Sequence, residues 1–211
     1  MNNIIPRRTA ASLGIAAIAS LALPRASWSA PPPVSAPPIL HSLGSEDAPS
    51  VVEEYFSYTC SHCAKFAAET FPQIKSALVD TGRVRWVFRD FPLDGLGLLV
   101  ASLAMELNSS RYVAFQEMML KRQESWAVPQ AEKSLPSIKV LAALVGIPAA
   151  TFDAIALSEH PFRKAVIEER IWGTQEYSVD STPSFVLTHP GKPGFEKRVN
   201  MPFEEFMKWV A

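Results

Sequence analysis

Two segments in the first half of the chain have the composition of β-strands. Residues 51–58 and 84–91 are rich in β-branched and aromatic side chains, and turn-forming residues bound them. Between them, apolar positions recur at helical spacing over residues 60–78, and Gly82 ends the pattern. Pro72 lies inside this span, so we expect it to kink the helix. The pattern therefore predicts a strand, a helix and a second strand.

The rest of the chain changes to helical periodicity before it returns to strands. Apolar residues recur every three or four positions in five successive segments, namely 96–107, 112–122, 136–145, 149–157 and 161–177. Residues 184–188 and 197–200 then predict a hairpin, and residues 202–210 a closing helix with one apolar face. A βαβ unit and a ββα unit separated by helices predict the α/β class, with one mixed sheet flanked by helices and an inserted helical domain.

The first thirty residues have the pattern of a targeting segment. Two arginines precede an almost unbroken run of small and apolar residues over 10–23, and residues 27–29 offer small side chains where a signal peptidase reads. The run is shorter than the roughly 20 apolar residues that a membrane-spanning helix needs. We therefore predict a signal peptide over residues 1–29 and a protein exported to the bacterial periplasm or cell envelope. The arginine pair leaves the Sec and Tat routes both open.

These segments divide the remaining chain into four parts. Residues 30–44 are rich in proline and predict an extended linker. Residues 45–95 are expected to form the first part of the sheet domain, residues 96–170 the inserted helical domain, and residues 171–211 the second part of the sheet domain.

The charge balance bears on the possible partners. The chain has 20 basic and 21 acidic residues, and the predicted signal peptide holds three of the basic residues and no acidic one. The exported chain is therefore acidic and carries no run of lysine or arginine. Nucleic acids and anionic membranes bind to basic patches, so we expect neither as a partner.

Only two cysteines occur, Cys60 and Cys63, and both lie within four residues. A disulfide that closes so short a loop stabilises a fold by only about 2 kcal/mol, so a reactive role explains the pair better. Cys60 falls at the start of the predicted helix, where free N–H groups and the helix dipole stabilise a thiolate. Cys63 is one turn further in, where it can attack a mixed disulfide. The imidazole of His62 can donate to the thiolate or, when charged, attract it.

Metal and haem sites are the competing interpretations of the same cysteines. Covalent haem requires a histidine directly after the second cysteine, and Ala64 stands there. Zinc or copper could use both cysteines and a histidine. However, no second Cys-x-x-Cys occurs, and His41, His160 and His189 are isolated. We expect redox chemistry with no cofactor and no metal, and keep a copper or zinc module as the lesser alternative.

Three motifs resemble the thioredoxin superfamily and, within it, the DsbA-like exported thiol–disulfide oxidoreductases. They are Glu-Tyr-Phe-Ser-Tyr-Thr-Cys-Ser-His-Cys at 54–63, Phe-Arg-Asp-Phe-Pro-Leu at 88–93, and Ser-Thr-Pro-Ser-Phe at 181–185. The resemblance extends from about residue 45 to the end of the chain. It implies that Pro183 is a cis-proline facing the cysteines, and that Thr182 offers backbone groups to an extended peptide substrate.

Glu54 is a candidate proton carrier. The resemblance implies a buried acid beneath the cysteines at this position. We expect that Glu54 is buried with a raised pKa and that it exchanges a proton with Cys63. Its neighbour Glu53 should point to the opposite face of the strand, because side chains alternate along a strand.

The resemblance implies a dithiol oxidase that passes its disulfide to reduced exported polypeptides and is reoxidised by a membrane partner. Two positions leave the direction of electron flow open. The best-known DsbA motif has proline where this chain has Ser61, and a threonine such as Thr182 also precedes the cis-proline in reductases and isomerases of the superfamily. An exported reductase or isomerase is therefore the alternative. Known isomerases of this kind have a dimerisation segment, which residues 30–44 are too short to supply, and we expect a monomer.

Overall fold

The computed structural model describes residues 35, 37–38, 41–128 and 131–211. The predicted signal peptide and most of the predicted linker lie outside these residues, so both stay predictions. No helix in the described part of the chain is long and apolar enough to cross a membrane.

A mixed sheet of five strands forms the centre of the described residues, in the order β1-β3-β2-β4-β5. The strands are β1 (Ser42–Leu43), β2 (Ser50–Phe56), β3 (Val84–Asp90), β4 (Ser184–Thr188) and β5 (Glu196–Val199). The pair β2–β3 is parallel, and the pairs β1–β3, β2–β4 and β4–β5 are antiparallel. The predicted mixed sheet is confirmed.

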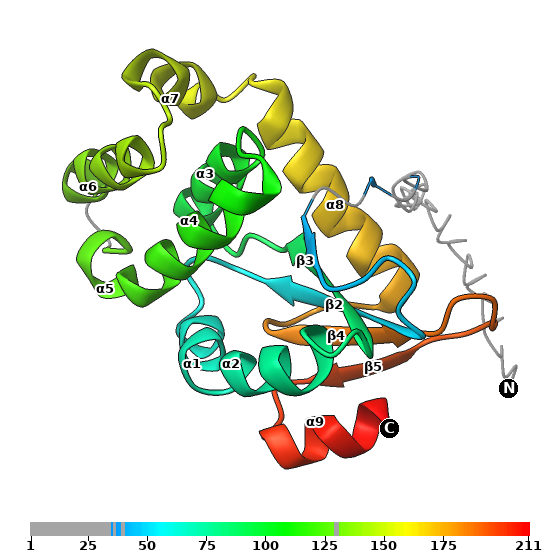
Figure 1. Ribbon diagram of the computed structural model, residues 1–211. Coiled ribbons are helices and arrows are strands. Elements are labelled where there is room, and N and C mark those ends of the chain that lie inside the picture. The colour runs from blue at the N-terminus through cyan, green and yellow to red at the C-terminus, as the bar shows by residue number, and fades with distance from the viewer. Residues whose placement is uncertain (1–34, 36, 39–40, 129–130) are drawn as a thin grey trace, which may run out of the picture. The chain divides into compact units, whose positions relative to one another are not determined.

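Helices cover both faces of the sheet (Figure 1). One face carries α1 (Ser61–Glu69), α2 (Phe71–Ile74), the π-helical turn η1 (Lys75–Val79) and α9 (Phe203–Val210), and the other carries α8 (Pro161–Tyr177). The remaining helices gather beyond the end of the sheet where β2 and β3 finish (Figure 1). They are α3 (Gly95–Ala104), α4 (Ser109–Lys121), α5 (Gln123–Trp126), α6 (Ala131–Leu144) and α7 (Ala149–Ala156).

The connection between β2 and β3 differs from the single kinked helix that the sequence predicts. The chain breaks at Thr70, so that Pro72 falls in the first turn of α2. A proline is tolerated there because that turn needs no internal N–H donor. The chain then widens into η1, and Gly82, with a φ of 73°, follows its end. The predicted end of the helical segment is confirmed, and the kink expected near Pro72 takes the form of a break at Thr70 between two helices.

Two other element boundaries also differ from the prediction. Helix α6 begins at Ala131, whereas the sequence pattern places its start at Pro136, which lies in the second turn. Pro136 removes the N–H that would reach the carbonyl of Glu132, and water can satisfy that carbonyl because Glu132 is exposed. The short strand β1 was expected to be linker, and it pairs with β3.

The helices and strands do not test the predicted boundaries of the inserted helical domain. The boundary at 95–96 falls at the start of α3, and the boundary at 170 falls inside α8. The described residues form one compact unit. The extent of an inserted domain therefore stays a prediction.

The central strand β2 is buried on both faces and separates two apolar cores. Val52 and Phe56 belong to the large core under α1 and α9, whereas Tyr55 packs in a smaller core with Phe91 and Trp172, on the side of α8. Phe185 of the adjacent strand joins the large core. Because side chains alternate along a strand, consecutive residues of β2 meet different environments.

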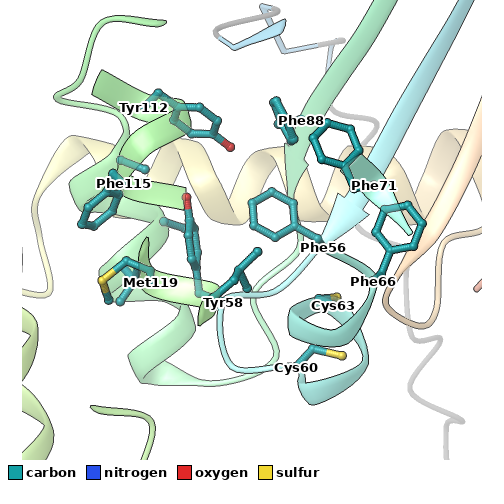
Figure 2. Packing of buried hydrophobic residues seen from close by; sticks show 14 of the residues in the cluster. Phe56, Tyr58, Cys60, Cys63, Phe66, Phe71, Phe88, Tyr112, Phe115 and Met119 are labelled. Atoms are coloured by element: carbon teal, nitrogen blue, oxygen red, sulfur yellow. The ribbon is translucent and has the colours of Figure 1, made fainter. Parts of the chain in front are cut away.

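Aromatic rings connect the end of β2 with the helices beyond the sheet (Figure 2). The ring of Tyr58 lies 5.0 Å from that of Phe56 and 6.1 Å from that of Phe115, which is on α4. Figure 2 shows Tyr58 between the strand and α4, directly before the segment that bears Cys60. Aromatic pairs of this kind contribute about 1 kcal/mol each beyond the area they bury. This cluster anchors the segment from which α1 begins.

The outer strands of the sheet offer little surface for pairing. Strand β1 has two residues, and β5 is the opposite edge of the sheet. Glu196, Arg198 and Val199 of β5 are exposed, and Lys197 is half-buried.

Helix α8 packs so closely on the sheet at Gly173 that we expect this position to tolerate no added side chain. A Cβ placed on Gly173 would collide with the ring of Tyr55, which is fully buried in β2. We expect Gly173→Ala to lower the free energy of unfolding by about 1–3 kcal/mol, because the packed ring cannot move away. Gly95→Ala is the control, since a Cβ there meets nothing within 4 Å. Denaturant unfolding of both variants tests this, and equal stabilities would contradict it.

Candidate active site

Cys60 lies where the central strand turns into a helix. Strand β2 ends at Phe56, and the N–H of Cys60 donates to the carbonyl of Ser57 at 3.1 Å, which closes a tight turn. Cys60 is the residue that caps the N-terminus of α1, and its carbonyl accepts the N–H of Ala64 at 3.1 Å. The predicted placement of Cys60 at a helix N-terminus is confirmed.

The segment before β4 lies against the Cys60 sulfur. The Cys60 thiol donates to the carbonyl of Thr182 across 3.4 Å, and the bond between Thr182 and Pro183 is cis, as predicted. The Thr182 hydroxyl is buried and has no hydrogen-bond partner in the described part of the chain while Cys60 is a thiol. That hydroxyl is therefore available to donate to the sulfur when Cys60 loses its proton.

The surroundings of Cys60 favour its thiolate. Its pKa falls from 9.0 to about 5, chiefly because the Cys63 thiol donates a hydrogen bond to the sulfur. Burial acts against this, and the Thr182 hydroxyl and the backbone N–H groups of Cys63 and His62 lower the pKa further. The helix N-terminus thus contributes as predicted, although the neighbouring cysteine contributes more.

His62 is exposed near the start of α1. Its contribution to the lowered pKa of Cys60 is a backbone hydrogen bond. The part that the sequence analysis assigns to its imidazole therefore stays a prediction.

Cys63 has the opposite character. It is fully buried in the first turn of α1 (Figure 2), and the two cysteines are not joined. Its pKa is raised above 9.0, first by burial and then by the hydrogen bond it gives to Cys60 and the nearby Cys60 charge. At neutral pH the site therefore holds one thiolate and one protonated thiol, and the thiolate is on the more accessible residue.

Glu54 is a buried acid on the same side of the sheet as the cysteines. Its side chain is only 2% exposed, and its carboxyl accepts the indole N–H of Trp86 at 3.1 Å. Burial raises the pKa of Glu54 to about 8, and the bond from Trp86 partly offsets this. The charge of Glu54 also raises the pKa of Cys63, so the two groups interact. The predicted burial and raised pKa are confirmed, and proton exchange with Cys63 stays a prediction.

Glu53 points to the opposite face, as predicted. Its carboxylate accepts the Arg89 Nε–H at 2.6 Å, and Nη1 of Arg89 donates to Glu169 of α8 at 3.1 Å. All three groups are nearly or fully buried. Two adjacent glutamates of β2 therefore differ in role. Glu53 is one half of a buried ion pair, whereas Glu54 has no cationic partner among the residues that the structure describes.

Sequence analysis missed two residues that support the site. Gln123 of α5 donates to the carbonyls of Tyr58 and Cys60, and the indole of Trp86 donates to Glu54. All three bonds join residues more than thirty positions apart. A side chain that contacts a distant backbone leaves no periodic pattern, so the sequence alone offered no signal for either residue.

The structure bears on the metal alternative in one respect. Within the described residues, no group of three histidine, cysteine or acidic side chains is placed to hold a metal ion. His41 stacks on Tyr112, with ring centroids 3.6 Å apart, and Nδ1 of His160 accepts the N–H of Phe162. Nδ1 of His189 lies 3.1 Å from the hydroxyl of Ser50. Each of these histidines thus has a structural contact.

A Cys-x-x-Cys pair at a helix N-terminus, opposite a cis-proline that precedes a strand of a mixed sheet, defines the thioredoxin class of proteins. The sequence model described as thioredoxin matches residues 38–194, and the chain belongs to this family. The predicted thioredoxin-like fold and the resemblance to DsbA-like proteins are confirmed by this match and by the relatives below.

Relatives with related names match over parts of the chain. A Rickettsia bellii protein named as a protein-disulfide oxidoreductase is 30% identical over 148 residues, or 69% of this chain and 55% of that protein. Disulfide bond formation protein D of Bacillus subtilis is 30% identical over 95 residues, or 41% of this chain and 43% of that protein. The chain thus spans about half the length of the curated relatives it matches.

Solved structures match over a larger share of both chains. The crystal structure of Wolbachia pipientis alpha-DsbA1 has a TM-score of 0.72 and 26% identity, over 80% of this chain and 87% of that one. The oxidised form of BdbD from Bacillus subtilis has a TM-score of 0.64 and 20% identity, over 84% and 95% of the two chains, which shows a shared fold.

The buried Glu54 predicts a loss of stability at neutral pH. Its folded pKa of about 8 lies above the ordinary value of 4.5, so the folded protein holds a proton that the unfolded chain releases above pH 4.5. Stability therefore falls by about 1.4 kcal/mol per pH unit between these values. Glu54→Gln keeps an acceptor for Trp86 and removes the ionisation. We expect this variant to be more stable at pH 7, by up to about 3 kcal/mol, and no more stable near pH 4.5.

Denaturant unfolding of the oxidised protein measures this effect without titration of the cysteine thiols. Glu53→Gln is the matched control, and we expect it to be less stable at pH 7 because Arg89 loses a buried carboxylate. A Glu54→Gln variant with the pH dependence of the unmodified protein would contradict the assignment.

Proposed function

We propose that the protein is a thiol–disulfide oxidoreductase, and specifically a dithiol oxidase that introduces disulfides into reduced exported polypeptides. The observation that carries this proposal is the contrast between the two sulfurs, with the pKa of Cys60 near 5 and that of Cys63 raised. The names of the Rickettsia and Bacillus relatives agree with it.

In the proposed reaction the oxidised protein holds a Cys60–Cys63 disulfide. A client thiolate attacks the Cys60 sulfur, a mixed disulfide forms, and Cys63 leaves. A second client thiolate then attacks the client sulfur of the mixed disulfide, and Cys60 leaves. The client gains one disulfide and loses two electrons, which the protein retains as two reduced cysteines. A sulfur with a low pKa leaves faster, so the environment of Cys60 favours the second step.

Glu54 is the proposed proton donor to Cys63. The Cys63 sulfur leaves into a buried site, where a charge is costly. Glu54 lies in the same buried region, and its pKa of about 8 keeps it protonated at neutral pH. It can therefore supply a proton as Cys63 leaves and recover it from solvent later. His62 is proposed to act on Cys60 from the exposed side.

Thr182 and Pro183 are the proposed binding site for the client backbone. The Thr182 carbonyl is 3.4 Å from the Cys60 sulfur, and β4 begins directly after Pro183. An extended peptide joined to Cys60 would run beside this segment and pair with its backbone groups, as in strand addition.

The proposed setting is the periplasm or cell envelope, where reduced exported polypeptides are the clients and a membrane partner reoxidises the protein. The signal peptide predicted over residues 1–29 supports export. We further propose that the protein acts as a monomer. The alternative, an exported reductase or isomerase, differs in the preferred redox state.

The roles of the two cysteines can be separated by trapping. Cys63→Ser, mixed with a disulfide-bonded polypeptide, should accumulate a mixed disulfide through Cys60, because no second thiol can release it. Cys60→Ser should accumulate none, because the remaining thiol is buried with a raised pKa. Non-reducing electrophoresis and mass spectrometry measure the adducts. The reverse pattern would show that Cys63 is the attacking residue.

The direction of electron flow is tested by the relative stability of the two redox forms. The folded pKa of Cys60, about 5, lies below its ordinary value of 9.0, so ionisation stabilises the reduced form fully above pH 9. This stabilisation declines by about 1.4 kcal/mol per pH unit and is lost as the pH falls through 5. At pH 7 it amounts to about 3 kcal/mol, against about 2 kcal/mol from closing the short disulfide loop.

Denaturant unfolding of both forms at pH 7 and pH 4 measures this difference. We expect the reduced form to be the more stable at pH 7 and its advantage to disappear at pH 4. A more stable reduced form makes the protein an oxidant toward its clients. An oxidised form that is the more stable at pH 7 would support the reductase alternative.

A further inference from the structure

One side chain from the helices beyond the sheet reaches the backbone around Cys60. Gln123 is the first residue of α5, and its side chain is buried. Its Nε2 donates to the carbonyl of Tyr58 at 2.7 Å and to the carbonyl of Cys60 at 3.0 Å. An amide nitrogen has two hydrogens, so this group uses both on the turn that presents Cys60.

The two carbonyls occupy critical positions in that turn. The N–H of Cys60 closes the turn on Ser57, and the Cys60 carbonyl starts the hydrogen-bond ladder of α1 by accepting from Ala64. The orientation of the next peptide groups decides whether the N–H groups of His62 and Cys63 point at the Cys60 sulfur. A clamp on the carbonyls of Tyr58 and Cys60 therefore fixes the direction of the donors that follow.

We propose that Gln123 is a positioning residue, whose amide holds the turn around Cys60 and thereby sets the oxidising strength of the cysteine pair. This inference rests on the function proposed above. It assigns to the helices beyond the sheet a direct influence on the redox reaction, in addition to any contact with clients.

The Gln123 amide stabilises the Cys60 thiolate through two physical effects. The amide holds the carbonyls of Tyr58 and Cys60 in place, so that the N–H groups of His62 and Cys63 keep pointing at the Cys60 sulfur and add to the field of the helix N-terminus. The amide hydrogens also satisfy the carbonyl of the buried Tyr58, where an unpaired acceptor is costly and would drive the turn to rearrange, and they give the Cys60 carbonyl a second donor beside Ala64. Loss of the amide should therefore weaken the stabilisation of the Cys60 thiolate and favour the disulfide.

The test compares Gln123→Met and Gln123→Glu with the unmodified protein. Methionine has a similar length and no donor, and glutamate places a negative charge against the two carbonyls. Thiolate absorbance at 240 nm as a function of pH gives the pKa of Cys60, and the equilibrium with reduced and oxidised glutathione gives the oxidising strength. We expect the pKa to rise in the order Gln, Met, Glu. The equilibrium constant for reduction should fall roughly tenfold with methionine, the value of one hydrogen bond, and further with glutamate.

Trp126→Phe is the control in the same helix. The indole of Trp126 donates to the carbonyl of Met119 at 2.8 Å, and this bond does not involve the turn around Cys60. Its loss should lower the melting temperature and leave the pKa of Cys60 and the glutathione equilibrium unchanged. Gln123 variants that lose thermal stability in the same way, with no change in pKa or equilibrium, would overturn the proposal and leave Gln123 a purely structural residue.

Two further outcomes keep the test decisive. If neither variant folds, Gln123→Asn retains the amide but reaches one carbonyl at most. It should then show a smaller shift in the same direction, and no shift would overturn the proposal. If Cys60 of the unmodified protein titrates near 9, the proposed function itself fails. An unmodified protein with a low pKa that the variants share contradicts only the role of Gln123.

Discussion

The central strand β2 is packed on both faces, and this constraint organises the site. Successive side chains of β2 point alternately to two different cores, so Glu53 and Glu54 have different environments. The charge of Glu53 on one face is balanced by Arg89, whereas Glu54 on the other face accepts the indole N–H of Trp86 and lies on the side of the cysteines. The strand therefore brings one buried acid, Glu54, close to the reactive pair, while its other face holds α8 against the sheet.

From this strand follows the difference between the two sulfurs. The tight turn after β2 leaves Cys60 at the end of α1, next to Thr182, and places Cys63 one turn deeper against the core. One helical turn therefore separates Cys60, whose surroundings favour a negative charge, from Cys63, whose surroundings oppose one. Burial lowers the reactivity of Cys63, and the hydrogen bond that Cys63 gives also increases the acidity of Cys60. The two sulfurs are consequently one electrostatic unit.

The sequence predicted those parts of the fold and site that depend on residues close together along the chain. Strands β2 and β3 appear within two residues of their expected bounds, because each is an apolar run between turn residues. The cysteine pair, Glu54 and the cis-proline were expected because they lie in short motifs. The rest depends on contacts between distant residues. Strand β1 is too short to show a period, and the amide of Gln123 bonds to backbone more than sixty positions away. The start of α6 was misplaced because Pro136 suggests a first turn, whereas the helix begins five residues earlier and tolerates the proline on its exposed side.

The margins of the sheet have a consequence for the proposed action on unfolded chains. An unfolded client exposes long backbone segments that readily add to any open β-edge, and such addition would lead to co-aggregation. Here one margin is two residues long, and the other has four residues, of which one is acidic, two are basic and the last is a valine. Neither margin can recruit a long client strand. Under the proposed function, backbone pairing with a client would be confined to the short segment beside Cys60 and would end once the client sulfur is freed.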